Sequence, residues 1–340
     1  MKLSIIVPVY NMVADGKLEY CLESLVGQTI TDYEIIAVDD YSTDESLQLL
    51  REYEKRYPEK FRVIASPENR KQGGAKNLGI EVATGKWIGF IDSDDWITPN
   101  MYQRLIEKAE ETGSDMVACD YQLVHTHSMK PGKVVANHKE NQVGALNEEQ
   151  YRSLVLDSGS LVVKIYLRNR LLEFCPKFPE HMFYEDNAVS NAYVLQATKF
   201  AYIPEPMYYY YQHEGSTVHT ITRKRCEDRM AAARFMLKHG KEENYLDRYR
   251  QEIEYKYTLL FYLNTIFSYV VTSERRSLTF MRRMAREMRE TFPDFRENPY
   301  YIQRTDPEWK KFVNLHMKST VLFVVYYDLL RAYRRIRYGE

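Results

Sequence analysis

Residues 90–96 read FIDSDDW, so an apolar strand runs directly into three carboxylates, Asp92, Asp94 and Asp95. Carboxylates this close repel one another unless they share a cation. Their hard oxygens suit Mg²⁺ or Mn²⁺, and Mg²⁺ is usually held by one or two carboxylates together with substrate phosphates. The segment therefore predicts a divalent-metal site, with an acidic exit from a strand as the alternative.

Apolar runs and amphipathic segments alternate on both sides of this motif. The spacing predicts strands at residues 2–9, 33–38, 62–65, 87–91 and 115–123, and helices at 17–28, 74–83 and 101–112. A capping box at residues 42–45 predicts a further helix that ends near Arg56. This order requires an α/β fold with a Rossmann-like, mostly parallel sheet and right-handed crossovers. Ligands of such sheets gather at the carboxyl ends of strands, where Tyr10, Asp39 and Asp92 fall.

The charge is divided unevenly along the 340 residues. Residues 1–222 carry a net charge of −10, whereas residues 223–340 carry +9, from 25 Lys/Arg against 16 Asp/Glu. We therefore predict two domains that contact different partners, 1–222 and 223–340, the second mainly helical. Residues 125–145 are polar and predict an exposed loop or hairpin. The four cysteines are far apart with no CxxC pair, and no run of 18 apolar residues occurs, so we expect a cytoplasmic protein.

Five short motifs follow one another along the first 220 residues. They read PVYN at 8–11, VDDYSTD at 38–44, NRKQGGAKNLGI at 69–80, DSDD at 92–95 and YEDN at 184–187. The set resembles the inverting family 2 glycosyltransferases, a group with the GT-A fold that builds bacterial polysaccharides and modifies cell-wall polymers. In that family the D-x-D motif corresponds to Asp92 and Asp94.

The resemblance implies a nucleotide-sugar donor, most often linked to UDP. Tyr10 can provide a flat wall for the base and Asp39 an acceptor for its imide N–H, with Pro8 fixing the backbone between them. Tyr10 as a simple cap on the sheet is the alternative. Asp94 is the expected metal contact, and Asp92 faces the ribose or a second metal position beside Ser93. Asp95 is either a third ligand or a helper.

A glycine pair, Gly73 and Gly74, precedes one predicted helix. The free amides of that helix favour anions, and Lys76 adds a cation. The resemblance implies that Lys76 and Asn77 line the donor site, together with Gly73. The neighbouring basic residues 70 and 71 are typical of a solvated turn.

The reaction requires a carboxylate that takes the proton of the acceptor hydroxyl while the hydroxyl attacks opposite the leaving phosphate. Asp186 matches the family's catalytic base, and Glu185 would orient it or bind acceptor hydroxyls. A charged first turn of a helix is the alternative for both. His213 and Ser216 match a segment that closes over the donor, and the tyrosines at 208–211 are expected to alternate between the two faces of a strand.

The last predicted helix carries apolar residues on one stripe, Leu322, Tyr326, Leu329, Tyr333 and Ile336, and ends in four arginines. Cations at a helix C-terminus complement its dipole, which is the simplest explanation. The alternatives are peripheral contact with the inner face of an anionic membrane, a homo-oligomer, or binding of an anionic polymer.

These observations predict a metal-dependent inverting glycosyltransferase that uses Mn²⁺ or Mg²⁺. Its acceptor would be a hydroxyl of a glycan, a lipid-linked sugar or a cell-wall polymer. A nucleotidyltransferase is one alternative, but its Gly-rich basic loop after the first strand is missing from PVYNMVADG. A nucleic-acid-binding protein is another; the rear cations are mixed with acids and no binding motif is present, so no nucleic-acid partner is expected.

Overall fold

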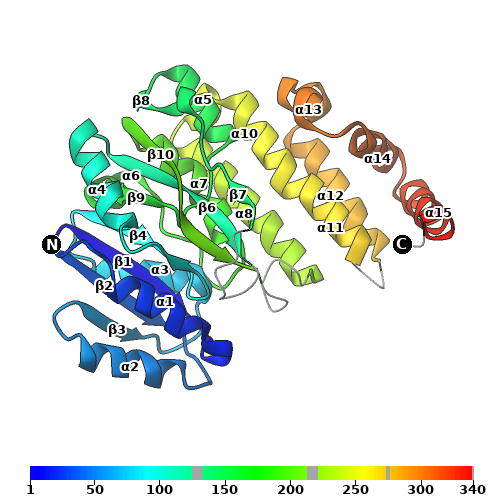
Figure 1. Ribbon diagram of the computed structural model, residues 1–340. Helices are drawn as coiled ribbons and strands as arrows, with labels where there is room; N and C mark the ends of the chain where they lie inside the picture. The colour runs from blue at the N-terminus through cyan, green and yellow to red at the C-terminus, as the bar shows by residue number, and fades with distance from the viewer. Residues whose placement is uncertain (125–131, 213–220, 273–275, 339–340) are drawn as a thin grey trace. The chain divides into compact units, whose positions relative to one another are not determined.

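The computed structural model describes residues 1–124, 132–212, 221–272 and 276–338 (Figure 1). The chain divides into two compact units, Met1–His219 and Thr220–Glu340, which we call the front unit and the rear unit. The functional roles predicted for the two domains stay predictions.

The front unit is built on a mixed sheet with the strand order β3-β2-β1-β4-β9-β6-β10-β5. Its first half is parallel and alternates with helices. These elements are β1 (Leu3–Val9), α1 (Lys17–Val26), β2 (Tyr33–Asp39), α2 (Ser46–Arg56), β3 (Phe61–Ala65), α3 (Lys71–Val82) and β4 (Trp87–Phe90). Every residue of β1 and β2 is buried, because helices cover both faces of this half.

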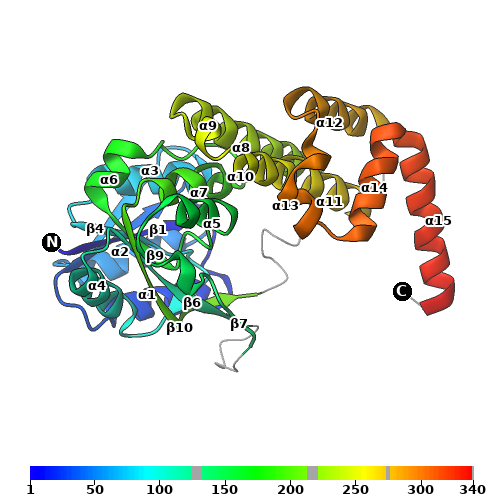
Figure 2. The ribbon, with the colours of Figure 1, turned by 90° about the horizontal axis from the view of Figure 1, so that it is seen from above.

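Helices cover both faces of the sheet. In Figure 2, α1 and α4 (Met101–Thr112) lie on one face of the sheet, and α3 and α7 (Glu185–Leu195) lie on the other. The packing of α3 on the sheet is tight. A Cβ at Gly79 would meet the Ile6 side chain at 2.5 Å, so glycine is needed where α3 crosses β1.

The second half of the sheet is mixed, because β9 runs antiparallel to both of its neighbours, β4 and β6. The remaining elements of the front unit are β5 (Trp96–Ile97), β6 (Met116–Val124), β7 (Val134–Val135), β8 (Gly144–Ala145), α5 (Glu148–Leu156), β9 (Lys164–Leu167), α6 (Arg168–Phe174) and β10 (Lys199–Tyr211). The predicted α/β fold class is confirmed. The predominantly parallel arrangement holds for β1 to β4 and for the pair of β6 and β10.

The predicted capping box at the start of α2 is wrong. The helix begins at Ser46, and its amide is capped by Asp44 Oδ1 at 2.9 Å. The Ser42 hydroxyl instead accepts the amide of Asn11 at 3.0 Å, and Asn11 Oδ1 accepts the amide of Thr43 at 2.8 Å. These polar side chains are therefore used to join the loops that follow β1 and β2, which lie side by side at the carboxyl edge.

The rear unit is helical, as predicted. Its elements are α8 (Arg223–Glu242), α9 (Tyr245–Arg248), α10 (Arg250–Tyr257), the π-helical turn Thr258–Leu263, α11 (Asn264–Thr272), α12 (Leu278–Thr291), α13 (Pro299–Arg304), α14 (Pro307–Lys318) and α15 (Thr320–Tyr338). Within this unit α15 lies at an outer edge beside α14 (Figure 2). Among the described residues, no helix combines the length and apolarity needed to cross a membrane.

Candidate active site

The candidate site begins where β1, β2 and β4 end. Val9 is in register with Asp39 across β1 and β2, and β4 runs parallel to β1 on the other side. The residues that follow these strands therefore meet at one edge of the sheet. Asn11 (53°) after β1 and Tyr41 (65°) after β2 have positive φ angles, which are rare outside glycine and typical of functional loops, as do Lys71 (63°) at the start of α3 and His181 (58°) and Tyr184 (65°) before α7.

Asp39 has an unsatisfied acceptor at this edge. The side chain is 2% exposed, and its Oδ2 accepts the Ser42 amide at 3.1 Å. Its Oδ1 is buried and has no hydrogen-bond partner in the described structure. Tyr10 is 43% exposed, and the Lys71 ammonium lies 5.6 Å from the centre of its ring. Pro8 is buried within β1, and its predicted role in fixing the backbone stays a prediction.

The acidic segment contains carboxylates in different environments. Burial raises the pKa of Asp92 to about 7, even though the Lys76 ammonium opposes the shift, and Asp92 Oδ1 is buried without a partner in the described structure. Asp94 is half-buried, and Ser93 is 5% exposed between them. The described residues contain no group of three or more His, Cys, Asp and Glu side chains placed to hold a metal by themselves. Any ion here would take further oxygen ligands from water or a bound substrate.

Asp95 has a structural position. It is fully buried, and it accepts hydrogen bonds from the Tyr208 hydroxyl (2.5 Å) and the Tyr211 amide (2.8 Å). Burial raises its pKa well above the usual range for an aspartate. Both oxygens thus tie the acidic segment to β10. Of the two predicted roles, these contacts support the helper and not the metal ligand.

Lys76 forms a buried ion pair with Glu185. The Nζ to Oε1 distance is 2.7 Å, and the two side chains are 2% and 6% exposed. Burial alone would lower the pKa of Lys76, but Glu185, Asp92 and Asp186 together raise it. The cation that Lys76 was predicted to add to the donor site is therefore already paired with a protein carboxylate. It links α3 to the first turn of α7 and faces the end of β4.

The first turn of α7 presents the predicted base. Tyr184 begins the helix in a left-handed conformation, and Glu185 is buried directly after it. Asp186 is half-buried, and its Oδ1 accepts a hydrogen bond from the Asn187 side chain at 2.8 Å. Asp186 also influences the pKa of both Lys76 and Asp92, so the charges of α7 and the acidic segment interact. The placement is compatible with both the predicted base and a charged first turn.

The helix α3 begins at Lys71, three residues earlier than predicted, so Gly73 and Gly74 lie inside it. A Cβ at Gly73 would lie 2.2 Å from the carbonyl oxygen of Pro179. Asn77 donates to the Phe178 carbonyl (3.0 Å) and accepts the Phe178 amide (3.0 Å). The structure therefore gives Gly73 and Asn77 packing roles: they hold residues 178–185 against α3, and through that segment they position Glu185 and Asp186.

Sequence reasoning missed the contacts of the basic turn before α3. Arg70 pairs with Glu180, with Nε at 2.9 Å and an Nη at 2.8 Å from Oε2. The Lys71 ammonium lies over the rings of Tyr10 and Phe183, 5.6 and 5.2 Å from their centres. The prediction of a solvated turn is therefore wrong. No local signal could have revealed this, because Glu180 and Phe183 are more than 100 residues away in the chain.

Two donor-site predictions cannot be placed. His213 and Ser216 lie outside the described residues. Of the tyrosines at 208–211, only Tyr208 is fully buried, and the other three are partly exposed. The expected alternation between the two faces is confirmed, because residues 208–211 pair with 121–124 in continuous register and both Tyr209 and Tyr211 contact the Trp96 ring.

Comparison with known proteins agrees with this arrangement. The model of the family "Glycosyl transferase family 2" matches residues 4–154. The putative glycosyltransferase EpsH of Bacillus subtilis is 32% identical over 263 residues, which cover 74% of this chain and 73% of EpsH. The uncharacterized glycosyltransferase YibD of Escherichia coli is 30% identical over 219 residues, 63% of this chain and 62% of YibD. The poly(ribitol-phosphate) beta-glucosyltransferase of Bacillus spizizenii is 32% identical over 219 residues, 62% of this chain but only 32% of that protein.

Solved structures show the same fold. The crystal structure of S. aureus TarS 1-349 in complex with UDP-GlcNAc has a TM-score of 0.65 at 22% identity, covering 100% of this chain and 93% of that chain. The architecture is thus that of the GT-A glycosyltransferases with a helical C-terminal region. Together with the match to EpsH, this shows that the chain belongs to glycosyl transferase family 2.

Proposed function

We propose that this protein transfers a sugar from a UDP-linked donor to a hydroxyl of a glycan, a lipid-linked sugar or a cell-wall polymer, with inversion at the anomeric carbon. The observation that carries the proposal is the convergence of Asp92, after β4, and Asp186, in the first turn of α7, on the buried cation of Lys76. Membership of the family sets aside the nucleotidyltransferase and the nucleic-acid-binding alternatives. The TarS complex with UDP-GlcNAc and the polymer named for the Bacillus spizizenii relative support the donor and acceptor classes.

The nucleotide base is proposed to bind between Tyr10 and Asp39. A buried carboxylate oxygen without a hydrogen-bond partner is costly, so Asp39 Oδ1 fits an acceptor reserved for a ligand donor such as the imide N–H of uracil. The exposed ring of Tyr10 offers an apolar face for stacking. The Lys71 ammonium beside that ring adds positive charge close to where the donor's phosphates would follow.

The diphosphate is proposed to bind with Mn²⁺ or Mg²⁺ at Asp94, with Asp92 in support. These carboxylates fit such an ion, because Asp92 Oδ1 is buried without a partner and hard oxygen ligands suit both metals. A mannosyltransferase from Pyrobaculum calidifontis with the same fold, at a TM-score of 0.50 and 13% identity, was crystallised with GDP-Man and Mn²⁺. When bound, the ion would neutralise charge on the leaving diphosphate.

Asp186 is proposed to take the proton of the acceptor hydroxyl. Its carboxylate is held by Asn187 and is half-exposed, so an acceptor can reach it. Glu185 is occupied by Lys76 and acts as a positioning residue. The pair fixes the first turn of α7 against α3, and the Lys76 charge keeps Asp92 and Asp186 from repelling each other.

Replacing Asp94 by alanine should abolish transfer and weaken Mn²⁺-dependent UDP binding by more than about tenfold, because the metal loses a carboxylate ligand. Thermal-shift titration of UDP with and without Mn²⁺ measures this, since a ligand of the folded state raises the melting temperature. Asp32→Ala is the matched control, because Asp32 is exposed before β2, at the opposite edge of the sheet. Unchanged Mn²⁺-dependent UDP binding by Asp94→Ala would remove Asp94 from the metal site.

A peripheral membrane contact is proposed for α15. One face of this helix packs on α14, where Phe323 meets Phe312 with ring centres 5.9 Å apart. Another stripe is exposed: Leu322 by 56%, Leu329 by 66% and Ile336 by 87%, with Val325 and Tyr333 each half exposed. Tyr326, which was predicted on this stripe, is 47% exposed, but its ring also contacts Phe312 with centres 5.6 Å apart. The helix carries four arginines after residue 330 and one acid, Asp328. Apolar and basic residues on one surface helix favour an anionic lipid surface, and such a contact would place the protein at the inner face of a membrane.

Serine at both Leu329 and Ile336 should reduce binding to phosphatidylglycerol vesicles by about tenfold or more, because two exposed apolar anchors are lost. Flotation of the full chain with these vesicles measures the effect. Ile302→Ser, which alters a residue 54% exposed on α13, is the control. If flotation is unchanged while light scattering shows a dimer becoming a monomer, the stripe is an interface between two copies and the membrane proposal fails.

A further inference from the structure

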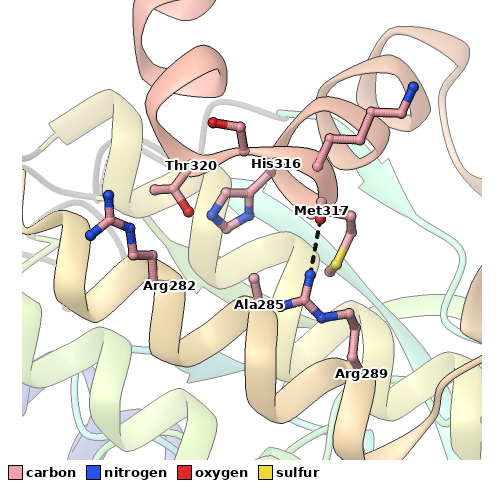
Figure 3. A pocket seen from close by; sticks show the side chains of 8 residues that line it. Arg282, Ala285, Arg289, His316, Met317 and Thr320 are labelled. Carbon is pink, nitrogen blue, oxygen red and sulfur yellow. Dashed lines mark hydrogen bonds between the residues drawn. The ribbon is translucent and has the colours of Figure 1, made fainter.

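The rear unit contains a small polar cavity of about 270 Å³ between α12 and the junction of α14 with α15 (Figure 3). Its wall is formed by Arg282, Ala285, Arg289, His316, Met317, Lys318, Ser319 and Thr320. All of these residues belong to the rear unit, and none is acidic. The cavity is separate from the residues assigned to sugar transfer.

Three cations surround the cavity. Arg282, Arg289 and Lys318 are all exposed side chains, and in the described structure none of them forms an ion pair with a carboxylate. Arg289 donates to the Met317 carbonyl oxygen at 2.9 Å, at the end of α14. This bond fixes the guanidinium at the cavity wall and leaves its other N–H groups for a ligand. A capping role accounts for Arg289 but not for the other two cations.

A buried histidine gives an independent indication of a ligand. His316 is 2% exposed, and its Nδ1 lies 2.7 Å from the Tyr262 hydroxyl. Its Nε2 is buried and has no hydrogen-bond partner in the described structure. Figure 3 shows the ring directed towards α12, between the side chains of Arg282 and Arg289.

The protonation of His316 follows from its surroundings. Burial, and secondly the charge of Arg289, lower its pKa to about 4, so the ring is neutral near pH 7. The Tyr262 hydroxyl can donate to Nδ1, which then carries no proton. With this tautomer the proton of the neutral ring is on Nε2, and the N–H is a donor that lacks an acceptor in the described structure.

The start of α15 adds further donors. Ser319 precedes the helix, and its hydroxyl accepts the Leu322 amide at 3.3 Å. The first amides of a helix have no partner within it and carry the positive end of its dipole. In this 19-residue helix those amides begin at Thr320, which lines the cavity.

We propose that this cavity is a binding site for a phosphate group, held by Arg282, Lys318 and the Nε2–H of His316. With the first amides of α15, the donors come from three segments, α12, α14 and α15, which suits the oxygens of a tetrahedral anion. The group could belong to free phosphate, to a soluble phosphate ester or to a lipid headgroup, and the site is independent of the proposed transferase function.

The test compares two double variants of the full chain with equal charge. Arg282→Gln with Lys318→Gln alters the cavity, whereas Arg286→Gln with Lys311→Gln removes two exposed cations from the same helices, α12 and α14, outside the cavity wall. Calorimetric titration with inorganic phosphate and with glycerol 3-phosphate, at constant ionic strength, should show at least about tenfold weaker binding for the first pair only. Vesicles of phosphatidylglycerol replace the soluble ligands in a third arm.

The arms distinguish the sources of the phosphate. If the cavity variant alone loses binding of the soluble ligands, the phosphate belongs to a soluble phosphate or ester. If the cavity variant alone loses binding and does so only with vesicles, the phosphate belongs to a lipid headgroup. Equal binding by the two double variants in every arm overturns the proposal, because the cavity cations would then contribute no more to binding than other exposed cations on the same helices. As a measurement without mutation, phosphate should shift the ¹⁵N resonance of His316 Nε2 in the unmodified protein, and an unmoved signal at saturating phosphate would also overturn it.

Discussion

Replacing Asp186 by asparagine should abolish sugar transfer while leaving UDP binding nearly intact. Asparagine has almost the same shape, so the hydrogen bond with Asn187 and the packing of the first turn of α7 can persist. It cannot accept the proton of the acceptor hydroxyl, and a positioned general base typically contributes about 10²–10⁴-fold to the rate. The loss should appear in kcat, measured as release of UDP in the presence of an acceptor.

The control for Asp186→Asn separates chemistry from helix stability. Glu149→Gln removes a charge from the first turn of α5, where an acidic residue also favours the helix dipole. Each variant should lower the free energy of unfolding by less than about 1 kcal/mol, since that is the usual size of a dipole effect. Only Asp186→Asn should lose activity. Full turnover by Asp186→Asn would mean that another group takes the proton.

The sequence predicted the strand ends well because they obey local rules. Buried strands read as short apolar runs, and a parallel sheet brings its carboxyl ends to one edge. Tyr10, Asp39 and Asp92 could therefore be assigned to one site before any coordinates were known. The predicted start of α2 was wrong, because the side chain expected to cap it forms a hydrogen bond with another loop. Ser42 has the sequence position of a capping residue, but its hydroxyl accepts a hydrogen bond from the Asn11 amide instead.

The partners of the site residues could not be predicted, because they come from distant parts of the chain. Lys76 and Glu185 are 109 residues apart, and Asp95 and Tyr208 are 113 residues apart. Sequence spacing carries no information about such pairs once several loops intervene. The consequence is a change of role: Lys76 and Asp95 have the charges expected at a donor site, yet each is already satisfied by a protein group. Their contacts tie α3 to α7 and the acidic segment to β10.

Replacing Lys76 by methionine should destabilise the protein by about 3–5 kcal/mol, because Glu185 would remain as an uncompensated buried charge. Methionine keeps most of the aliphatic volume, so a packing defect contributes little. Urea unfolding of the front unit measures the change. Lys177→Met is the matched control: its pair with Glu81 is also 2.7 Å long, but the two side chains are 76% and 52% exposed, so the loss should stay below about 1 kcal/mol.

Adding Glu185→Gln to Lys76→Met should restore much of the lost stability, because the double variant leaves no unpaired charge in the pair. Transfer activity should not return, since Asp92 and Asp186 would face each other without the cation that balances them. Recovery of stability without recovery of transfer activity would show that Lys76 has an electrostatic role at the site in addition to a structural one. If stability and activity recover together, Lys76 serves only to anchor α7. If Lys76→Met is no more costly than Lys177→Met, the pair is not buried in solution and the charge arrangement proposed for the site is wrong.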